Sequence, residues 1–132
     1  MDSVLVLKAA SIERCLKRIA EDYGNDFAVD LTKQDAVILN LQRTCQLAID
    51  MAGHIVRVKK MGVPDSNTGS FKLLQKAEII SESLARRMES MIGFRNIAIH
   101  EYQELDLEIV EGIINSRLGA FREFTELVLK MS

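Results

Sequence analysis

Residues 32–61, TKQDAVILNLQRTCQLAIDMAGHIVRVKKM, decide the fold class of this chain. Apolar side chains recur every three or four positions along the stretch, which is the spacing of a helix with a buried face. Such a helix would be about 45 Å long and would begin near Asp30 or Thr32, whose side chains can accept hydrogen bonds from free backbone N–H groups. Its apolar set is broad enough to be covered from more than one side, so we expect the central helix of a bundle. The expected buried residues are Val37, Ile38, Leu41, Cys45, Ala48, Met51, Ala52, Ile55 and Val56.

Helical patterns also lie on both sides of this stretch. A first helix is expected over residues 3–22, and the turn formers of residues 23–26 end it. Residues 62–70 hold the densest cluster of turn formers in the chain and are expected to form its longest loop. Two further helices are expected over about residues 70–80, with Ser70 as cap, and from Ser81 or Ser83 into residue 95.

A last helix is expected from Asp106 to about Lys130. Its apolar stripe is Leu107, Val110, Ile114, Leu118, Phe121, Phe124 and Val128. In the first helix, the residues expected to be buried are Val4, Leu7, Ile12, Leu16 and Ile19. The chain has one proline, and strand-like alternation is nearly absent. The sequence therefore predicts an all-α protein, an antiparallel four- or five-helix bundle that forms a single domain over residues 1–132.

The formal net charge of −2 does not support broad, sequence-independent binding of nucleic acid, which depends on many phosphate contacts. A local basic patch remains open, either as an RNA path or as ordinary solvated helix faces. The residues concerned are Arg14, Lys17, Arg18, Arg57, Lys59, Lys60, Arg86 and Arg87.

No apolar run has the length of a membrane span, and residues 1–8 lack the basic start of a signal peptide, so we expect a cytoplasmic protein that does not enter a membrane. Cys15 and Cys45 are the only cysteines. Because each is embedded in a helical pattern, we expect reduced core residues.

Residues 95–102, RNIAIHEY, hold the candidate site. Arg95 is a permanent cation whose guanidinium fits phosphate, and His100 can move protons near neutral pH, so together they suggest phosphoryl-transfer chemistry. The same residues are equally compatible with a helix end that carries a solvated arginine, a structural histidine and a half-buried Tyr102.

Helix geometry constrains how these residues could act together. In an unbroken helix Arg95 and His100 differ by about 140° around the axis, whereas Tyr102 lies within about 20° of Arg95. Either the helix loosens near His100 or a second chain completes the site. The apolar residues between the polar ones favour a shared cleft, so we expect a homodimer.

The spacing of Arg95, His100 and Tyr102, with Asn96 directly after the arginine, gives the pattern R-x4-H-x-Y. On this pattern the chain resembles the HEPN-domain toxins of the HepT family. The resemblance covers nearly the whole length, including residues 34–61, the Gly-Val-Pro turn after them and the run FKLL at residues 71–74.

The resemblance implies a HEPN-like bundle that dimerises and acts as a metal-independent endoribonuclease, the toxin of a type VII-like toxin–antitoxin system. Because RNA supplies its own 2′-OH nucleophile, His100 would act as general base or acid. Arg95 would bind the scissile phosphate, and Asn96 would orient the phosphate or a catalytic side chain. Neither a metal nor another cofactor is expected.

The family also implies a partner, a minimal nucleotidyltransferase (MNT) antitoxin that transfers AMP from ATP to the motif tyrosine, here Tyr102. Phosphate beside Arg95 would then compete with RNA, and a hetero-oligomer of toxin and antitoxin is expected. The bland alternative is a tyrosine that packs its ring and bonds a backbone group.

Two further alternatives stay open. The chain could be a non-catalytic helical subunit that binds a nucleotide or a partner nucleotidyltransferase, with Arg95 and His100 holding phosphate. It could also be a structural bundle without an active site. Asp50 and His54, spaced i, i+4 with Gln46 one turn before them, are expected to pair, either structurally or in support of the cleft.

Overall fold

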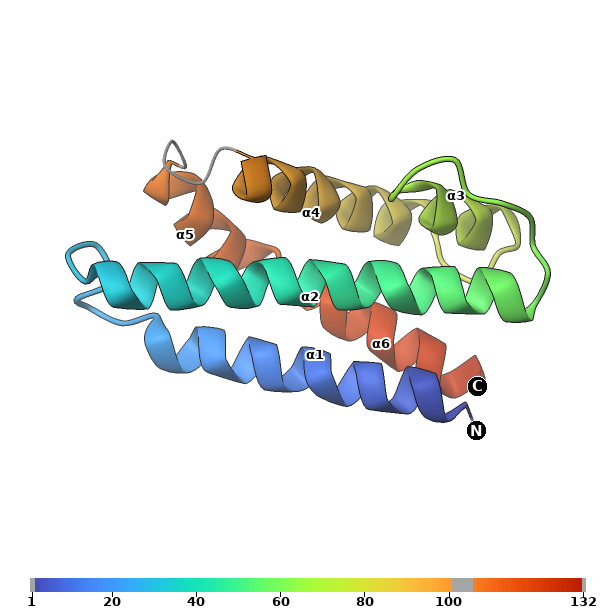
Figure 1. The fold of residues 1–132 in the computed structure, drawn as a ribbon, viewed down its shortest axis with the longest axis horizontal. Helices are drawn as coiled ribbons and strands as arrows, with labels where there is room; N and C mark the ends of the chain where they lie inside the picture. Colours follow the sequence, from blue (N-terminus) through green and yellow to red (C-terminus); the bar gives the residue numbers. More distant parts are fainter. Residues whose placement is uncertain (1, 101–105, 132) are drawn as a thin grey trace.

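The computed structural model describes the backbone of residues 2–100 and 106–131 and the side chains of residues 2–97 and 106–131. Within these ranges the chain is all helical, as predicted, and contains no strand (Figure 1). None of its helices is long and apolar enough to cross a membrane. The helices are α1 (Ser3–Asp22), α2 (Leu31–Val58), α3 (Gly69–Lys76), α4 (Glu82–His100), α5 (Leu107–Ser116) and α6 (Gly119–Met131).

α2 is the central helix, because α1, α3 and α4 all pack against it. Asp30 is its N-cap, since a side-chain oxygen of Asp30 accepts a hydrogen bond from the backbone N–H of Lys33 at 3.0 Å. The helix ends at Val58, three residues earlier than predicted, and Lys60 follows with a φ of 53° in the left-handed region. All nine residues predicted to be buried in this helix are at most 6% exposed.

α1 lies antiparallel beside α2 (Figure 1). Asp2 caps α1, because its Oδ1 atom accepts hydrogen bonds from two backbone N–H groups of the first turn, at 2.9 and 3.3 Å. The predicted buried face was wrong at its start, where Val4 and Leu7 are 37% and 68% exposed. Leu5 and Ala9 are buried instead, because they continue at helical spacing the row of buried residues in the rest of the helix.

α3 and α4 begin at different kinds of cap. Ser70 was predicted to cap α3, and this prediction was wrong. Ser70 is buried inside α3, close to Gly53 of α2, and Thr68 stands at the N-cap position. The small Ser70 side chain is used for packing α3 on α2 and is therefore not available as a cap. Ser81 Oγ accepts a hydrogen bond from the N–H of Leu84 at 3.0 Å, so α4 begins at the first of the two predicted serines.

The predicted last helix is two helices. Asp106 caps α5 as expected, accepting from the N–H of Glu108 at 2.9 Å. The helix stops at Ser116, whose hydroxyl donates to the carbonyl oxygen of Gly112 at 2.6 Å, and α6 starts at Gly119. Two glycines with low helix propensity and a serine bonded to the backbone weaken the helix at this point, which explains the break.

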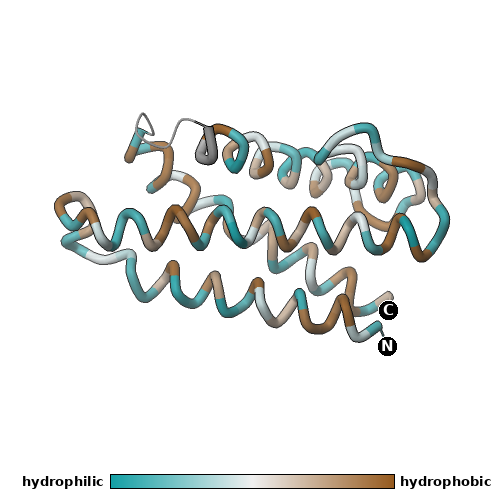
Figure 2. The backbone as a smooth tube through the Cα atoms, in the orientation of Figure 1, coloured by the Kyte–Doolittle hydropathy of each residue, from teal (hydrophilic) through white to brown (hydrophobic). Residues whose placement is uncertain are grey.

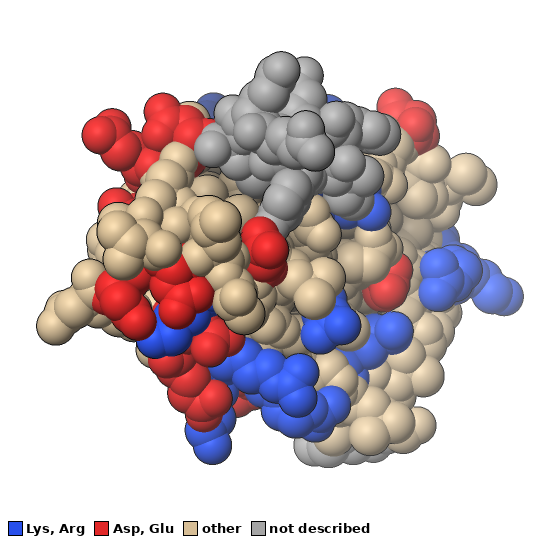
Figure 3. Space-filling model, turned by 60° about the vertical axis from the view of Figure 1, so that its left-hand side comes forward, with Lys and Arg blue, Asp and Glu red and all other residues tan. Residues whose placement is uncertain are grey.

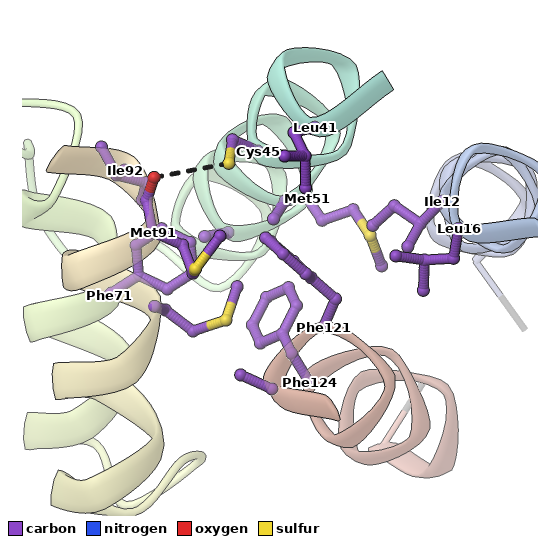
Figure 4. Packing of buried hydrophobic residues seen from close by; sticks show 14 of the residues in the cluster. Ile12, Leu16, Leu41, Cys45, Met51, Phe71, Met91, Ile92, Phe121 and Phe124 are labelled. Carbon is purple, nitrogen blue, oxygen red and sulfur yellow. Dashed lines mark hydrogen bonds between the residues drawn. The ribbon is translucent and has the colours of Figure 1, made fainter. Parts of the chain in front are cut away.

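The core lies between α2 and the helices around it. Figure 2 shows hydrophobic and hydrophilic residues alternating along the turns of α1 and α2, as expected for helices buried on one side. Figure 4 shows Phe71 and Phe124 in the same interior, where their ring centroids are 5.5 Å apart at an interplanar angle of 61°. Cys15 and Cys45 are free and buried, which confirms the prediction for both.

Candidate active site

Arg95 is fixed by two amides, one on its own helix and one on α2. Its Nη2 donates a hydrogen bond to Gln46 Oε1 at 2.5 Å, and its Nη1 donates to Asn96 Oδ1 at 2.8 Å. Both bonds are partly buried. The structure therefore brings together two of the predicted site residues, Arg95 and Asn96, and adds Gln46.

Gln46 is itself held in place by a second bond. Its Nε2 donates to Asp50 Oδ1 at 2.9 Å, and Asp50 Oδ2 lies 3.8 Å from Lys8 Nζ of α1. Both ends of the Gln46 amide are thus used, which fixes its orientation with the oxygen toward Arg95. A chain of polar contacts runs from α1 through α2 to the guanidinium on α4.

The Arg95 guanidinium keeps hydrogen-bonding capacity. Its Nε atom is buried and has no hydrogen-bond partner in the described part of the chain. Gln46 and Asn96, which hold the group, are neutral amides, so its positive charge is not neutralised by them. A buried polar group left unpaired is costly, and its presence here is typical of a site that receives a ligand.

Cys45, the neighbour of Gln46 in sequence, does not take part in polar chemistry. Burial raises the pKa of its thiol to about 12, although the Arg95 charge acts to lower it. Its Sγ lies 3.5 Å from the carbonyl oxygen of Met91 on α4, as the dashed line in Figure 4 shows. At neutral pH the thiol is therefore protonated and is a poor nucleophile.

The structure describes the other two predicted site residues, His100 and Tyr102, only in part or not at all. α4 continues as a helix to His100, but the His100 side chain and the whole of Tyr102 lie outside the described residues. The alternative of a helix that loosens near His100 involves residues 101–105, which lie outside the described residues.

The prediction that Asp50 and His54 pair with each other was wrong. Asp50 bonds Gln46 instead, and His54 Nε2 lies 2.7 Å from Asp2 Oδ2. Because α1 runs antiparallel to α2, the cap of α1 comes to rest beside the last turns of α2 and offers His54 a carboxylate. Only Asp50 therefore connects to Arg95.

The contact between Gln46 and Arg95 was not predicted. It joins residues 49 positions apart on different helices, and periodicity within one helix does not identify a partner across the bundle. A usable signal was the pair of polar residues, Gln46 and Asp50, one turn apart in the otherwise apolar stretch of residues 45–53.

An apolar hollow of about 580 Å³ lies between α4 and α5, beside the Arg95 segment. Phe94 and Ile97 of α4 and Ile109 and Ile113 of α5 are among its lining residues. Ile97 is 51% exposed and Ile109 is 56% exposed. Exposed isoleucines on both walls are typical of a surface that another chain covers.

No group of three or more His, Cys, Asp or Glu side chains with metal-binding geometry occurs among the residues that the structure describes. The described site offers a fixed guanidinium with amide support, which is suited to binding an anion such as phosphate.

Comparison with known proteins finds relatives that are HepT nucleases or HEPN toxins. The mRNA nuclease HepT of Shewanella oneidensis is 43% identical over 130 residues, which cover 97% of this chain and 98% of that protein. The tRNA nuclease HepT of Aphanizomenon flos-aquae is 33% identical over 86 residues, 65% of this chain and 56% of that protein. A solved structure of tri-AMPylated Shewanella oneidensis HEPN toxin in complex with MNT antitoxin is 43% identical and covers both chains fully, with a TM-score of 0.94.

The model of the family described as Ribonuclease HepT-like matches residues 9–128. This match spans most of the described helices and includes the R-x4-H-x-Y pattern. Together with the identity to the Shewanella protein over nearly the full length, it shows that the chain belongs to the Ribonuclease HepT-like family, as the resemblance predicted.

Proposed function

We propose that this chain is a metal-independent endoribonuclease, a single HEPN domain over residues 1–132 that serves as the toxin of a toxin–antitoxin system. Family membership and the 43% identity to an mRNA nuclease support the reaction class. Its cellular site would be the cytoplasm, where RNA and ATP are both present.

The observation that carries the proposal is the fixed guanidinium of Arg95. Gln46 and Asn96 hold it from two helices, so it needs no reorganisation when charge develops on a bound phosphate. The unpartnered Nε supplies a further donor for such a ligand once the local packing adjusts.

In the proposed reaction the 2′-oxygen of a ribose attacks the adjacent phosphorus. The bond from O2′ to phosphorus forms and the bond from phosphorus to O5′ breaks, which leaves a 2′,3′-cyclic phosphate and a 5′-hydroxyl. His100 accepts the 2′-OH proton or donates a proton to the leaving O5′. Arg95 stabilises the charge on the pentavalent phosphorus, and Asn96 keeps the guanidinium oriented.

The active form in this proposal is a homodimer. α4 is helical through His100, so the positions of Arg95 and His100 differ by about 140° around its axis, and a second copy is needed to bring both groups to one phosphate. The apolar hollow between α4 and α5, with half-exposed Ile97 and Ile109, is a suitable surface for that second copy.

Neutralisation in this proposal is covalent. The Tyr102 phenol oxygen attacks the α-phosphorus of Mg²⁺-bound ATP in the antitoxin, pyrophosphate leaves, and the phenolic proton passes to a base of that enzyme. The solved structure of a tri-AMPylated HEPN toxin with MNT antitoxin supports both the modification and the complex. Added phosphates near Arg95 would occupy the position of the RNA phosphate.

A direct test of the reaction compares messenger and transfer RNA with the same sequences carrying 2′-O-methyl ribose. Cleavage of the unmodified RNA to 2′,3′-cyclic phosphate ends, and none of the methylated RNA, is the expected result. If unmodified RNA is bound but never cut, the alternative of a non-catalytic phosphate-binding subunit replaces this proposal.

A further inference from the structure

A second groove, of about 390 Å³, lies between α1 and α2 and meets the Arg95 site at Gln46. Its two walls are rows of residues at helical spacing, one from Ser11 through Arg14 to Arg18 and the other from Arg43 through Gln46 to Asp50. The two ends of each row are seven residues apart, so the groove is about 10 Å long.

The groove is basic although the chain as a whole is acidic. Arg14, Arg18 and Arg43 line it, and Asp50 is the one carboxylate among its lining residues. Asp50 is already engaged by Gln46 and Lys8. Figure 3 brings the end of the molecule with the α1–α2 connection forward and shows Lys and Arg side chains gathered on the lower part of that face.

These arginines form no ion pair with another residue in the described part of the chain. Elsewhere in the described residues, Arg86, Arg87 and Arg122 each pair with a glutamate of the chain. In the groove Arg14 donates only to Ser11 Oγ, at 2.8 Å, and no described carboxylate pairs with it, with Arg18 or with Arg43. Exposed guanidinium groups that converge from two helices without acidic partners are suited to bidentate binding of phosphate.

Gln46 joins this groove to the candidate active site. The same side chain lines the groove and accepts the hydrogen bond from Arg95. A chain of phosphates that reached Arg95 would therefore pass directly into a basic channel.

We propose that the α1–α2 groove is a phosphate-binding subsite that holds the RNA backbone next to the scissile phosphate, through Arg14, Arg18 and Arg43. This inference rests on the proposed function and adds to it the path of the substrate. Such contacts position the RNA without selecting its bases.

The test is binding of a single-stranded 2′-O-methyl RNA dodecamer, which lacks the nucleophile, to the full-length protein over a range of salt concentrations. The variant is Arg18→Gln with Arg43→Gln. The matched control is Arg57→Gln with Arg86→Gln, which makes the same change of charge with exposed residues that do not line the groove. Circular dichroism and thermal unfolding verify that both double variants fold.

The groove variant should bind at least about tenfold more weakly at low salt, and its slope of log K against log salt should fall by about 1.4, because each phosphate contact on a single strand contributes about 0.7. The control should keep the wild-type affinity and slope.

If the wild type cuts RNA but both double variants bind the dodecamer with the same affinity and slope, the groove is not a subsite and the proposed function stands. If the groove variant loses only its assembly with the antitoxin, the groove is a protein interface and the inference is wrong. A wild type that neither binds nor cuts RNA removes the proposed function and this inference together.

Discussion

At the residue scale, the orientation of Arg95 depends on a single amide of another helix. Gln46 Oε1 accepts from Arg95, and Asp50 fixes the opposite end of the same amide. The guanidinium is therefore set before any ligand arrives, as catalysis by a fixed charge requires.

Replacing Gln46 by Leu should free the guanidinium and lower kcat for RNA cleavage by about 10- to 100-fold, because small misplacements of a catalytic group have effects of that order. KM should change less than kcat. Gln42→Leu, one turn away on the same helix, is the control and should retain wild-type kinetics. Equal rates for the two variants would show that Gln46 does not position Arg95.

Asp2 and His54 form a contact of 2.7 Å that ties the start of α1 to α2. The hydrogen bond from His54 holds the pKa of Asp2 below its ordinary value of 3.8. Burial acts against this shift, and the capping N–H groups and the His54 charge add smaller lowering effects. A lowered folded pKa stabilises the protein above the ordinary value, and the contribution disappears as pH falls through the folded value.

Asp2→Asn should therefore unfold at a lower temperature than the wild type at pH 6, and the difference should shrink below about pH 4 and disappear as pH falls through the lowered pKa of Asp2 in the folded protein. Asparagine also caps helices well, so the change removes the ionic contact while it keeps the cap. Thermal unfolding followed by circular dichroism at a series of pH values makes the comparison. A difference that persists unchanged to pH 3 would contradict the assignment.

At the element scale, α4 and α5 present the surface on which the proposed dimer depends. Ile97 and Ile109 are half exposed on either wall of the apolar hollow between these helices. Neither side chain belongs to the buried core of the single chain.

Ile109→Lys should convert the dimer into a folded monomer that no longer cuts RNA, since a charge in an apolar contact costs several kcal/mol when it is desolvated. Sedimentation equilibrium and RNA cleavage measure the two effects. Val63→Lys, at a position 93% exposed in the loop before α3, is the control. An Ile109→Lys protein that stays dimeric and active would place the interface elsewhere.

The core should be sensitive to truncation at Phe124, which is fully buried and packs on Phe71 of α3. Phe124→Ala should lower the free energy of unfolding by about 3–5 kcal/mol, through lost burial and the cavity left behind. Urea unfolding of the wild type and the variant measures this loss in the free energy of unfolding. A loss below about 1 kcal/mol would mean that α6 is not an integral part of the core.

The same elements show how far the sequence predicts this fold. The α2 stretch was predicted correctly, because its pattern is long and strongly periodic, and Asp106 and Ser81 were correct as caps. The break between α5 and α6 was missed, since a continuous apolar stripe crosses it and the weakening at Gly112 and Gly119 is a matter of local propensity. In the site, the motif identified Arg95 and Asn96, while Gln46 depends on helix packing that periodicity does not describe.

At the scale of the whole molecule, the distribution of charge matters more than its sum. The chain carries a net charge of −2, yet three arginines that form no ion pair within the described residues line one groove that leads to Arg95. The overall balance opposes non-specific binding of nucleic acid, and the local concentration of charge provides a site where phosphate is favoured. If RNA binds only through such a site, its affinity for the protein should fall strongly as salt is added.

The proposed AMPylation by an antitoxin belongs to the same scale, because it would change the net charge of the whole chain. Co-expression with the MNT protein should increase the intact mass of the chain by one or more adenylyl groups, and Tyr102→Phe should abolish the increase. The modified wild type should lose RNA cleavage. An unchanged mass in a complex that is nevertheless inactive would show that neutralisation is by contact alone.

The most direct test of the central claim is cleavage of end-labelled RNA by the purified, unmodified protein in excess EDTA, with Arg95→Ala, His100→Ala and the control Arg57→Ala alongside. Wild type and control should cut equally. The Arg95 and His100 variants, verified as folded, should each lose about 10²–10⁴ in rate. Wild-type protein that leaves every RNA intact, or site variants that cut as fast as the control, would contradict the account.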